Sequence, residues 1–172
     1  MSTAAIIALG TLGAVVAVMA GEAVLSAVNV KLLRERGATE PPDDVYRSMQ
    51  WAYPVVFVAI ALEGAVMGPS PQAALGLGVV VFGLAKALKA WAISTLGWRW
   101  SFRVLVPPGV PPIVAGPYRL VNHPNYVAVC GEIVGAALIV GAPVAGVLGL
   151  AGFAWLMRRR IAVEDRALGR RG

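Results

Sequence analysis

Long runs of apolar residues dominate the chain and alternate with short polar stretches. A helix needs about 20 apolar residues to cross the hydrocarbon core of a bilayer. Three runs reach or approach this length, at residues 4–30, 51–67 and 73–93. The pattern therefore predicts three membrane-spanning helices in the N-terminal part of the chain.

A fourth apolar stretch, at residues 126–157, is too long for a single spanning helix. At 1.5 Å per residue it would extend about 48 Å, whereas the bilayer core is about 30 Å thick. Gly141 and Pro143 lie at its middle, and proline interrupts the hydrogen-bond ladder of a helix. We therefore expect a helical hairpin of residues 126–140 and 143–157. The fold class expected is an all-α polytopic membrane bundle with five transmembrane helices.

The composition also indicates a membrane protein. Hydrophobic residues make up 58% and charged residues 14% of the 172 residues, against about 45–50% and about 25% in soluble domains. The mean hydropathy is +0.74. A single cysteine, Cys130, cannot form an intrachain disulfide. These figures exclude a disordered chain and a disulfide scaffold and argue against a soluble enzyme or a nucleic-acid partner. We expect residues 1–172 to form one domain.

Basic residues indicate the orientation, because Lys and Arg collect on the cytoplasmic side of a membrane. The net charge is +6, from 15 Lys and Arg against 9 Asp and Glu. With five spans and the N-terminus outside, all 15 lie on the cytoplasmic side. With four spans, six tail arginines would lie outside: Arg158, Arg159, Arg160, Arg166, Arg170 and Arg171. We therefore expect an outer N-terminus and a cytoplasmic C-terminus. The composition, rich in Ala, Gly, Val and Arg, suggests a bacterial inner membrane.

Glycines recur along both helices of the expected hairpin. Gly131 and Gly135 form a Gly-x-x-x-Gly step, and Gly146, Gly149 and Gly152 follow on the next helix. Small residues let membrane helices approach closely. This spacing predicts that the two hairpin helices pack tightly against each other.

The long segment of residues 94–125 lies on the expected cytoplasmic side. Loops of this length are uncommon unless they are functional or disordered. This one carries Trp98, Trp100, Phe102 and Tyr118, with prolines at positions 107, 108, 111, 112, 117 and 124. Such a composition predicts a folded cytoplasmic cap over a ligand. An interfacial loop without a ligand is the alternative.

The only histidine, His123, directly precedes Pro124 at the start of an expected helix. Proline suits the first helical turn, and a helix N-terminus attracts anionic groups. A purely structural hydrogen-bonding role is the alternative. One histidine without a Cys or His cluster predicts no metal site. Farther along, Arg160 and Glu164 share one helix face at i, i+4 spacing. An exposed ion pair is the alternative to a functional role for these two residues.

Three segments in the second half of the chain follow one another in a characteristic order. They are Gly116-Pro117-Tyr118-Arg119-Leu120-Val121-Asn122-His123-Pro124-Asn125-Tyr126, then the hairpin with Pro143, and then Arg160-x-x-x-Glu164-Asp165-x-x-Leu168. This combination resembles the isoprenylcysteine carboxyl methyltransferase family. Members of that family show Gly-x-Tyr, Arg-His-Pro-x-Tyr, a hairpin and Arg-x-x-x-Glu. Asn122 departs from the pattern, since the family usually has arginine there.

The resemblance implies an integral-membrane methyltransferase that uses S-adenosylmethionine, held by the cytoplasmic loop and the C-terminal helix. The cofactor-binding residues that it implies are Ile113, Val114, Tyr118, His123, Pro124, Asn125, Tyr126 and Glu164. Arg160 would be the catalytic residue and would face the methyl acceptor. Pro111 and Pro112 remove two backbone donors from a stretch through which family members contact the cofactor.

The acceptor implied by the resemblance is lipophilic and enters from the bilayer. Similar small members of the family resemble partners of type III polyketide synthases, so we rank a phenolic lipid such as an alkylresorcinol or alkylpyrone first. A carboxylate is ionised at neutral pH, whereas a phenol with a pKa of about 10 needs activation, by Arg160 or His123. The alternatives are a carboxyl methyltransferase for a prenylcysteine-like acceptor, a small proton-coupled transporter using Glu22 or Glu132, and a non-catalytic membrane scaffold.

Five ionisable residues lie inside the expected spans: Glu22, Glu63, Lys86, Lys89 and Glu132. Ionisable groups in a bilayer are costly and often functional. All of them except Glu63 fall in the expected cytoplasmic half, where we expect Glu–Lys pairs that fix helix packing. A polar wall of an acceptor tunnel is the functional alternative. The sequence assigns no role to Glu63.

Overall fold

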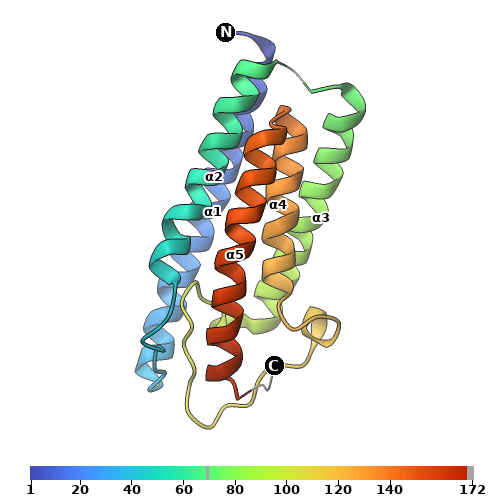
Figure 1. Cartoon of the computed structure of the whole chain (residues 1–172). Helices are drawn as coiled ribbons and strands as arrows, with labels where there is room; N and C mark the ends of the chain where they lie inside the picture. Colours follow the sequence, from blue (N-terminus) through green and yellow to red (C-terminus); the bar gives the residue numbers. More distant parts are fainter. Residues whose placement is uncertain (69, 170–172) are drawn as a thin grey trace.

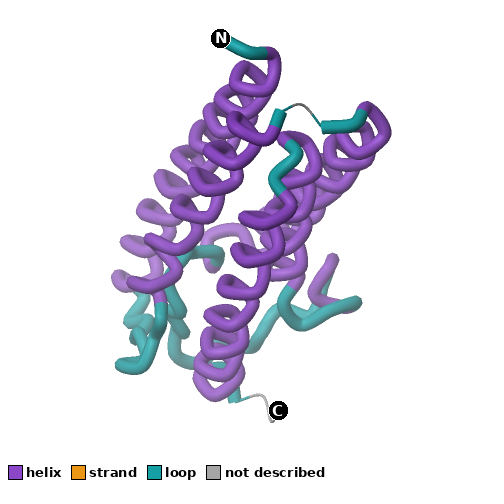
Figure 2. Tube along the Cα trace, turned by 45° about the horizontal axis from the view of Figure 1, so that its top comes forward, coloured by secondary structure: helices purple, strands orange, loops and turns teal. Residues whose placement is uncertain are grey.

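The computed structural model describes residues 1–68 and 70–169, so Arg170 and Arg171 of the charge argument lie outside the described residues. The described part has five α-helices: α1 (Thr3–Glu35), α2 (Tyr46–Met67), α3 (Gln72–Leu96), α4 (Pro124–Val140) and α5 (Pro143–Ala167). The α3–α4 loop also holds two short 3-10 turns, Gly97–Arg99 and Gly116–Arg119. The helices run side by side, and the α1–α2 loop, the α3–α4 loop and the last turns of α5 lie at one end (Figures 1 and 2). The all-α architecture is therefore confirmed for the described residues.

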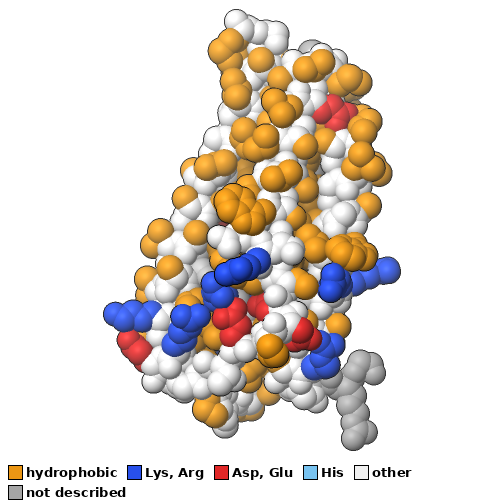
Figure 3. Space-filling view, turned by 60° about the vertical axis from the view of Figure 1, so that its left-hand side comes forward, with side chains coloured by type: hydrophobic (Ala, Val, Ile, Leu, Met, Phe, Trp, Pro, Cys, Tyr) orange, Lys and Arg blue, Asp and Glu red, His pale blue; other side chains and the backbone are white. Residues whose placement is uncertain are grey.

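The helices have the length and surface of membrane helices. α1, α2 and α3 are long and apolar enough to cross a membrane, and α4 is apolar but shorter, with 17 residues. Apolar side chains cover much of the visible surface, whereas Lys and Arg gather towards the end at which the two long loops lie (Figure 3). We call this end the basic end. Helices α1 and α5 continue past their apolar runs, through polar residues, to Glu35 and Ala167.

The junctions around α4 follow from proline and glycine chemistry. α4 begins at Pro124, where the missing backbone N–H removes no helical hydrogen bond. It ends at Val140, before Gly141 with a φ of 74°, a left-handed conformation that glycine adopts readily. α5 then begins at Pro143. This junction turns the chain back, so that α5 returns to the basic end.

Glycines allow close helix contacts, but Gly131 and Gly135 contact a different helix from the one that the sequence predicts. A Cβ on Gly135 would lie 2.7 Å from the Phe82 backbone nitrogen, and one on Gly131 would lie 2.8 Å from Ala85 Cβ. Both glycines therefore face α3, and their predicted role in packing the hairpin is wrong. Gly78 of α3 faces α4 in the same way, since a Cβ on it would lie 2.7 Å from a backbone nitrogen of α4. The absence of side chains on both faces lets the α3 and α4 backbones approach closely.

The other predicted glycine contacts are divided among the helices. Gly146 does face α4, where a Cβ would lie 2.5 Å from Ala137 Cβ. Gly149 instead faces Val56 of α2 at the same distance, 2.5 Å, and Gly152 faces open space. The hairpin contact thus depends on Gly146, while α5 also packs against α2.

Glu63, which has no role in the sequence analysis, caps α5 from the neighbouring helix α2. Its Oε1 accepts a hydrogen bond from the Val144 N–H at 3.0 Å, and its Oε2 accepts one from Ala145 at 2.5 Å. The first N–H groups of a helix have no partner inside the helix, and a carboxylate also complements the helix dipole. Glu63 therefore fixes the start of α5 at the end of the bundle opposite the basic end.

Polar residues of α1 hold the α3–α4 loop across the basic end. Asn29 donates to the Trp100 carbonyl at 2.7 Å, and Ser26 accepts from the Phe102 N–H at 2.9 Å. The backbones of Thr39 and Val106 then pair in an antiparallel bridge. These contacts fasten the loop to α1 and to the α1–α2 loop, so that it closes the basic end of the bundle.

Candidate active site

A cavity of about 400 Å³ lies at the basic end and extends between the helices. Eight of the nine sequence-predicted site residues line it: Ile113, Tyr118, His123, Pro124, Asn125, Tyr126, Arg160 and Glu164. Val114 does not line it and is 72% exposed. Asn122, the departure from the family pattern, also belongs to the wall. The fold thus brings two distant sequence segments to one cavity, and the roles of these residues remain predictions.

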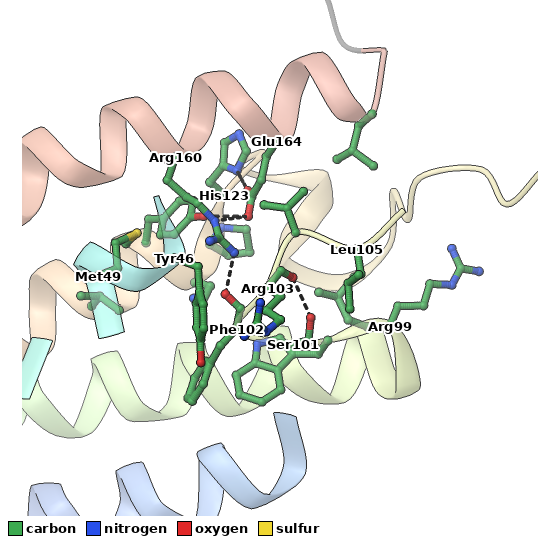
Figure 4. A pocket seen from close by; sticks show the side chains of 18 of the residues that line it. Tyr46, Met49, Arg99, Ser101, Phe102, Arg103, Leu105, His123, Arg160 and Glu164 are labelled. Carbon is green, nitrogen blue, oxygen red and sulfur yellow. Dashed lines mark hydrogen bonds and ion pairs between the residues drawn. The ribbon is translucent and has the colours of Figure 1, made fainter. Parts of the chain in front are cut away.

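The carboxylate of Glu164, on α5, contacts three side chains that line the cavity. Tyr126 donates to its Oε1 at 2.7 Å, and the Arg160 Nε donates to the same oxygen at 3.5 Å. His123 Nδ1 lies 3.1 Å from its Oε2. Figure 4 shows Arg160 and Glu164 side by side on α5, with His123 against the Glu164 carboxylate. Because Arg160 is only 4% exposed, the alternative of an exposed ion pair is wrong.

His123 lies between two carboxylates. Its Nε2 is 3.1 Å from Asp165 Oδ1, opposite the contact with Glu164, and its ring stacks on Tyr126. Burial lowers the pKa of His123, but the hydrogen bond and charge of Glu164 and the charge of Asp165 outweigh it and raise this pKa above its ordinary value. Burial raises the pKa of Glu164, but the His123 hydrogen bond and the Arg160 charge outweigh this effect and lower the pKa below its ordinary value. Both shifts favour the ionised pair.

Arg160 connects three separate parts of the chain. Its Nη1 lies 2.5 Å from Asp44 Oδ1 in the α1–α2 loop, and its Nη2 donates to the Phe102 carbonyl at 2.6 Å. The Arg160 and Asp44 side chains are only 5% and 4% exposed. The other Asp44 oxygen accepts from the Val104 N–H at 3.3 Å. We call the set that surrounds Arg160 and Glu164 the loop cluster: Asp44, His123, Arg160, Glu164 and Asp165.

One polar atom of the cavity wall is buried without a partner. Asn125 Oδ1 has no hydrogen-bond partner among residues 1–68 and 70–169. Leaving such a group unsatisfied costs about 1–3 kcal/mol, so a ligand that donates a hydrogen bond there gains stability. Within the same described ranges, no group of three or more His, Cys, Asp or Glu side chains is placed to hold a metal ion.

A second polar group lies deeper, between the helices. Lys89 Nζ lies 2.7 Å from Glu22 Oε2 and 3.4 Å from Glu132 Oε1, and Lys86 Nζ lies 3.0 Å from the same Glu132 oxygen. The Tyr53 hydroxyl donates to Glu132 Oε2. These five residues, all on α1 to α4, form what we call the helix cluster. The predicted Glu–Lys pairing is confirmed, and Tyr53 and Lys89 also line the cavity.

Two residues of these clusters escape prediction from sequence spacing. Asp44 is 116 residues from Arg160, and Tyr53 is 79 residues from Glu132. A weak signal exists for each. Asp43 and Asp44 are adjacent acidic residues in the polar segment between two apolar runs, and Tyr53 is the only hydroxyl-bearing side chain in its apolar run. Neither signal names a partner, because the partners meet only through the tertiary fold.

The apolar helices and the cavity at one end define the class, an integral-membrane protein with a cavity at its basic end. A family model for the isoprenylcysteine carboxyl methyltransferase (ICMT) family matches residues 74–170, more than half of the chain. The chain is also 31% identical over 150 residues to an uncharacterised protein, YpbQ, of Bacillus subtilis (strain 168), which covers 87% of this chain and 89% of YpbQ. No solved structure matches. The chain belongs to the ICMT family and is thus a member of a family of membrane methyltransferases.

Proposed function

We propose that the protein transfers the methyl group of S-adenosylmethionine to the hydroxyl oxygen of a lipophilic acceptor, with phenolic lipids such as alkylresorcinols or alkylpyrones as the acceptor class. One observation carries the proposal. A single cavity joins the family-pattern residues His123, Tyr126 and Glu164 at the basic end to an apolar wall that includes Val129 and Phe153 inside the bundle. A polar donor and an apolar acceptor can therefore meet in one space.

The cavity wall fits a cofactor that carries a positive charge and hydrogen-bond donors. Asn125 Oδ1 has a free acceptor site for an amino or hydroxyl group. Tyr118 and Tyr126 present aromatic rings in the wall, and aromatic faces attract cations such as a sulfonium. Glu164 and Asp165 add negative charge beside them. S-adenosylmethionine, when bound, supplies an electrophilic methyl group, and the residues named here would bind and orient it.

The charge of the loop cluster favours a neutral acceptor over a carboxylate. Arg160 is the candidate for recognising an acceptor anion, yet all three nitrogens of its guanidinium already have protein partners: Glu164, Asp44 and the Phe102 carbonyl. The cluster holds three carboxylates against one arginine and one histidine. A prenylcysteine-like carboxylate would therefore meet a surplus of negative charge, whereas an uncharged phenol would not.

We further propose that all five helices span a bacterial inner membrane, with the N-terminus outside and the basic end in the cytoplasm. The α4 helix of 17 residues and the apolar first part of α5 are short, so this requires a thin or locally adapted bilayer around the hairpin. The cofactor would then enter from the cytoplasm and the acceptor from the bilayer. The positions of Lys and Arg at one end support this orientation.

The test is methyl transfer from isotope-labelled S-adenosylmethionine in proteoliposomes, with an alkylresorcinol, an alkylpyrone and a prenylcysteine as acceptors. We expect label in the phenolic acceptors, and little in the prenylcysteine. Arg160→Gln should abolish transfer, whereas Arg159→Gln, which changes an exposed arginine next to it, should not. Preferential labelling of the prenylcysteine would overturn the acceptor class, and no transfer to any acceptor would count against the activity.

A further inference from the structure

Tyr53 stands where the cavity meets the helix cluster, since it lines the cavity and donates to Glu132. A hydroxyl acceptor must lose a proton during methyl transfer. The two bases of the loop cluster that line the cavity, His123 and Glu164, already have protein partners at both of their nitrogens or oxygens. Building on the proposed function, we propose that Tyr53 and Glu132 receive the proton of the acceptor hydroxyl. In this arrangement the inner end of the cavity holds the acceptor as a phenolate, with Tyr53 as the residue that touches it.

The Tyr53 side chain is held in a fixed orientation. Its ring makes an edge contact with Phe57, with ring centroids 5.0 Å apart, and a tilted contact with Phe153 at 5.5 Å. The Lys89 ammonium lies 5.2 Å from the centre of the same ring. Because the ring is confined on these sides and the hydroxyl donates to Glu132, its oxygen keeps a lone pair for a donor in the cavity.

The charges around Tyr53 are balanced, and they stay balanced when the acceptor proton moves to Glu132 and leaves a phenolate. The titratable groups that interact with it are Glu22 from α1, Lys89 from α3 and Glu132 from α4, while α5 contributes the apolar Phe153. Lys86 of α3 completes the cluster by pairing with both glutamates. Two lysines and two glutamates have no net charge. A proton on Glu132 gives the cluster one positive charge, which balances the negative charge of the phenolate beside it.

The proton, bonds and charges balance in the proposed step. The acceptor hydroxyl proton moves to the Tyr53 oxygen as the proton of Tyr53 moves to the Glu132 carboxylate. The bond between acceptor oxygen and methyl carbon forms while the sulfur–methyl bond of the donor breaks and leaves a neutral thioether. The proton that the overall reaction releases therefore rests on Glu132, and Tyr53 ends the step as a neutral phenol.

Helix packing alone does not account for the helix cluster. Taking ion pairs out of water costs about as much as their attraction returns, so buried pairs contribute little to stability compared with apolar packing. A cluster that only fixes the helices also has no need to reach the cavity. Here both Tyr53 and Lys89 do so, and Glu132, which is fully buried, reaches it through Tyr53.

The test uses the full chain in detergent without any methyl donor, and an alkyl-substituted 4-nitrophenol as the probe. Its phenol and phenolate absorb at different wavelengths, so a pH titration gives the ionisation of the bound probe directly. We expect a lower apparent pKa for the bound probe than in protein-free micelles. Tyr53→Phe should raise this apparent pKa by about one unit, a tenfold loss of ionisation, because the phenolate loses its hydrogen-bond donor.

Tyr46→Phe is the matched control, since it removes a hydroxyl from another part of the same wall and should keep the native apparent pKa. Unchanged S-adenosylhomocysteine binding by Tyr53→Phe would show that the variant is folded. A bound probe that ionises equally in the native protein and in Tyr53→Phe overturns the inference alone. Absence of any bound probe overturns the proposed acceptor class as well, so the two failures are distinguishable.

A second readout uses turnover with a series of phenols of decreasing pKa. If Tyr53 takes the proton, the loss of kcat in Tyr53→Phe should shrink as the acceptor becomes more acidic, because such phenols are already ionised. A purely structural role for Tyr53 predicts the same loss for every phenol, and that result would contradict the inference.

Discussion

The two polar clusters of this protein bury charge in different ways. The helix cluster takes every member from a regular helix and balances two lysines with two glutamates. The loop cluster joins two loops to α5 and sets three carboxylates against one arginine and one histidine. The first is therefore a fixed feature of the bundle, whereas the second closes the basic end and depends on the charge of His123.

The largest loss of stability is expected when one lysine of the helix cluster is removed and its two glutamates outnumber the remaining lysine. Lys89→Met leaves Glu22 and Glu132 buried with only the partly exposed Lys86 as a partner. Removing one partner of a buried pair costs about 3–5 kcal/mol, so the thermal unfolding temperature in detergent should fall strongly. Lys31→Met, at an exposed position of α1, is the control and should change stability by about 0.5 kcal/mol or less. Equal effects would show that the cluster is not balanced as described.

A somewhat smaller effect is expected at the loop cluster. Asp44→Ala removes the buried partner of Arg160 but leaves its contacts with Glu164 and the Phe102 carbonyl. We expect a loss of about 3 kcal/mol and faster proteolysis of the α3–α4 loop, which Asp44 also holds. The neighbouring Asp43→Ala breaks only an exposed pair with Arg166 and should cost about 0.5 kcal/mol. If the loop is protected equally in both variants, Asp44 does not hold it.

The smallest effect, and the one that separates the clusters most clearly, is pH dependence. The pKa of His123 is raised in the folded protein, so its contribution is complete below its ordinary pKa of about 6.5 and is lost as pH rises through the raised value. The pKa of Glu164 is lowered, so its contribution is present above its ordinary value and is lost as pH falls through the lowered one. Unfolding temperatures should therefore decline on the alkaline side.

His123→Gln tests this assignment, because glutamine can hydrogen-bond a carboxylate but cannot titrate. The variant should lose the alkaline decline while Lys89→Met keeps it. An alkaline decline that persists unchanged in His123→Gln would assign the titration to another group.

Much of the fold is predictable from the sequence because the bilayer imposes a simple pattern. The apolar runs mark the helices, and Gly141 and Pro143 mark the junction between α4 and α5. The partners of individual glycines are not predictable, as Gly135 shows. A small residue indicates close approach but does not tell which helix approaches.

The candidate site also has residues that the sequence predicts and residues that it does not. Residues 123–126 and 160–164 are recognisable because each forms a short local pattern that resembles a family motif. Their meeting at one cavity follows from the return of α5 to the basic end. Asp44 and Tyr53 carry no such pattern, since their contacts arise only when α2 and its preceding loop pack against α4 and α5. Val114 lies within the expected stretch, but the loop turns it outward.

The central claim is that the cavity at the basic end binds the methyl donor, and titration calorimetry of the detergent-purified protein with S-adenosylhomocysteine tests it most directly. We predict saturable binding at one site per chain, weakened in Glu164→Ala and His123→Ala and unchanged in Arg159→Gln. The absence of any binding heat at high micromolar concentrations, or equal affinity in all these variants, would contradict the account.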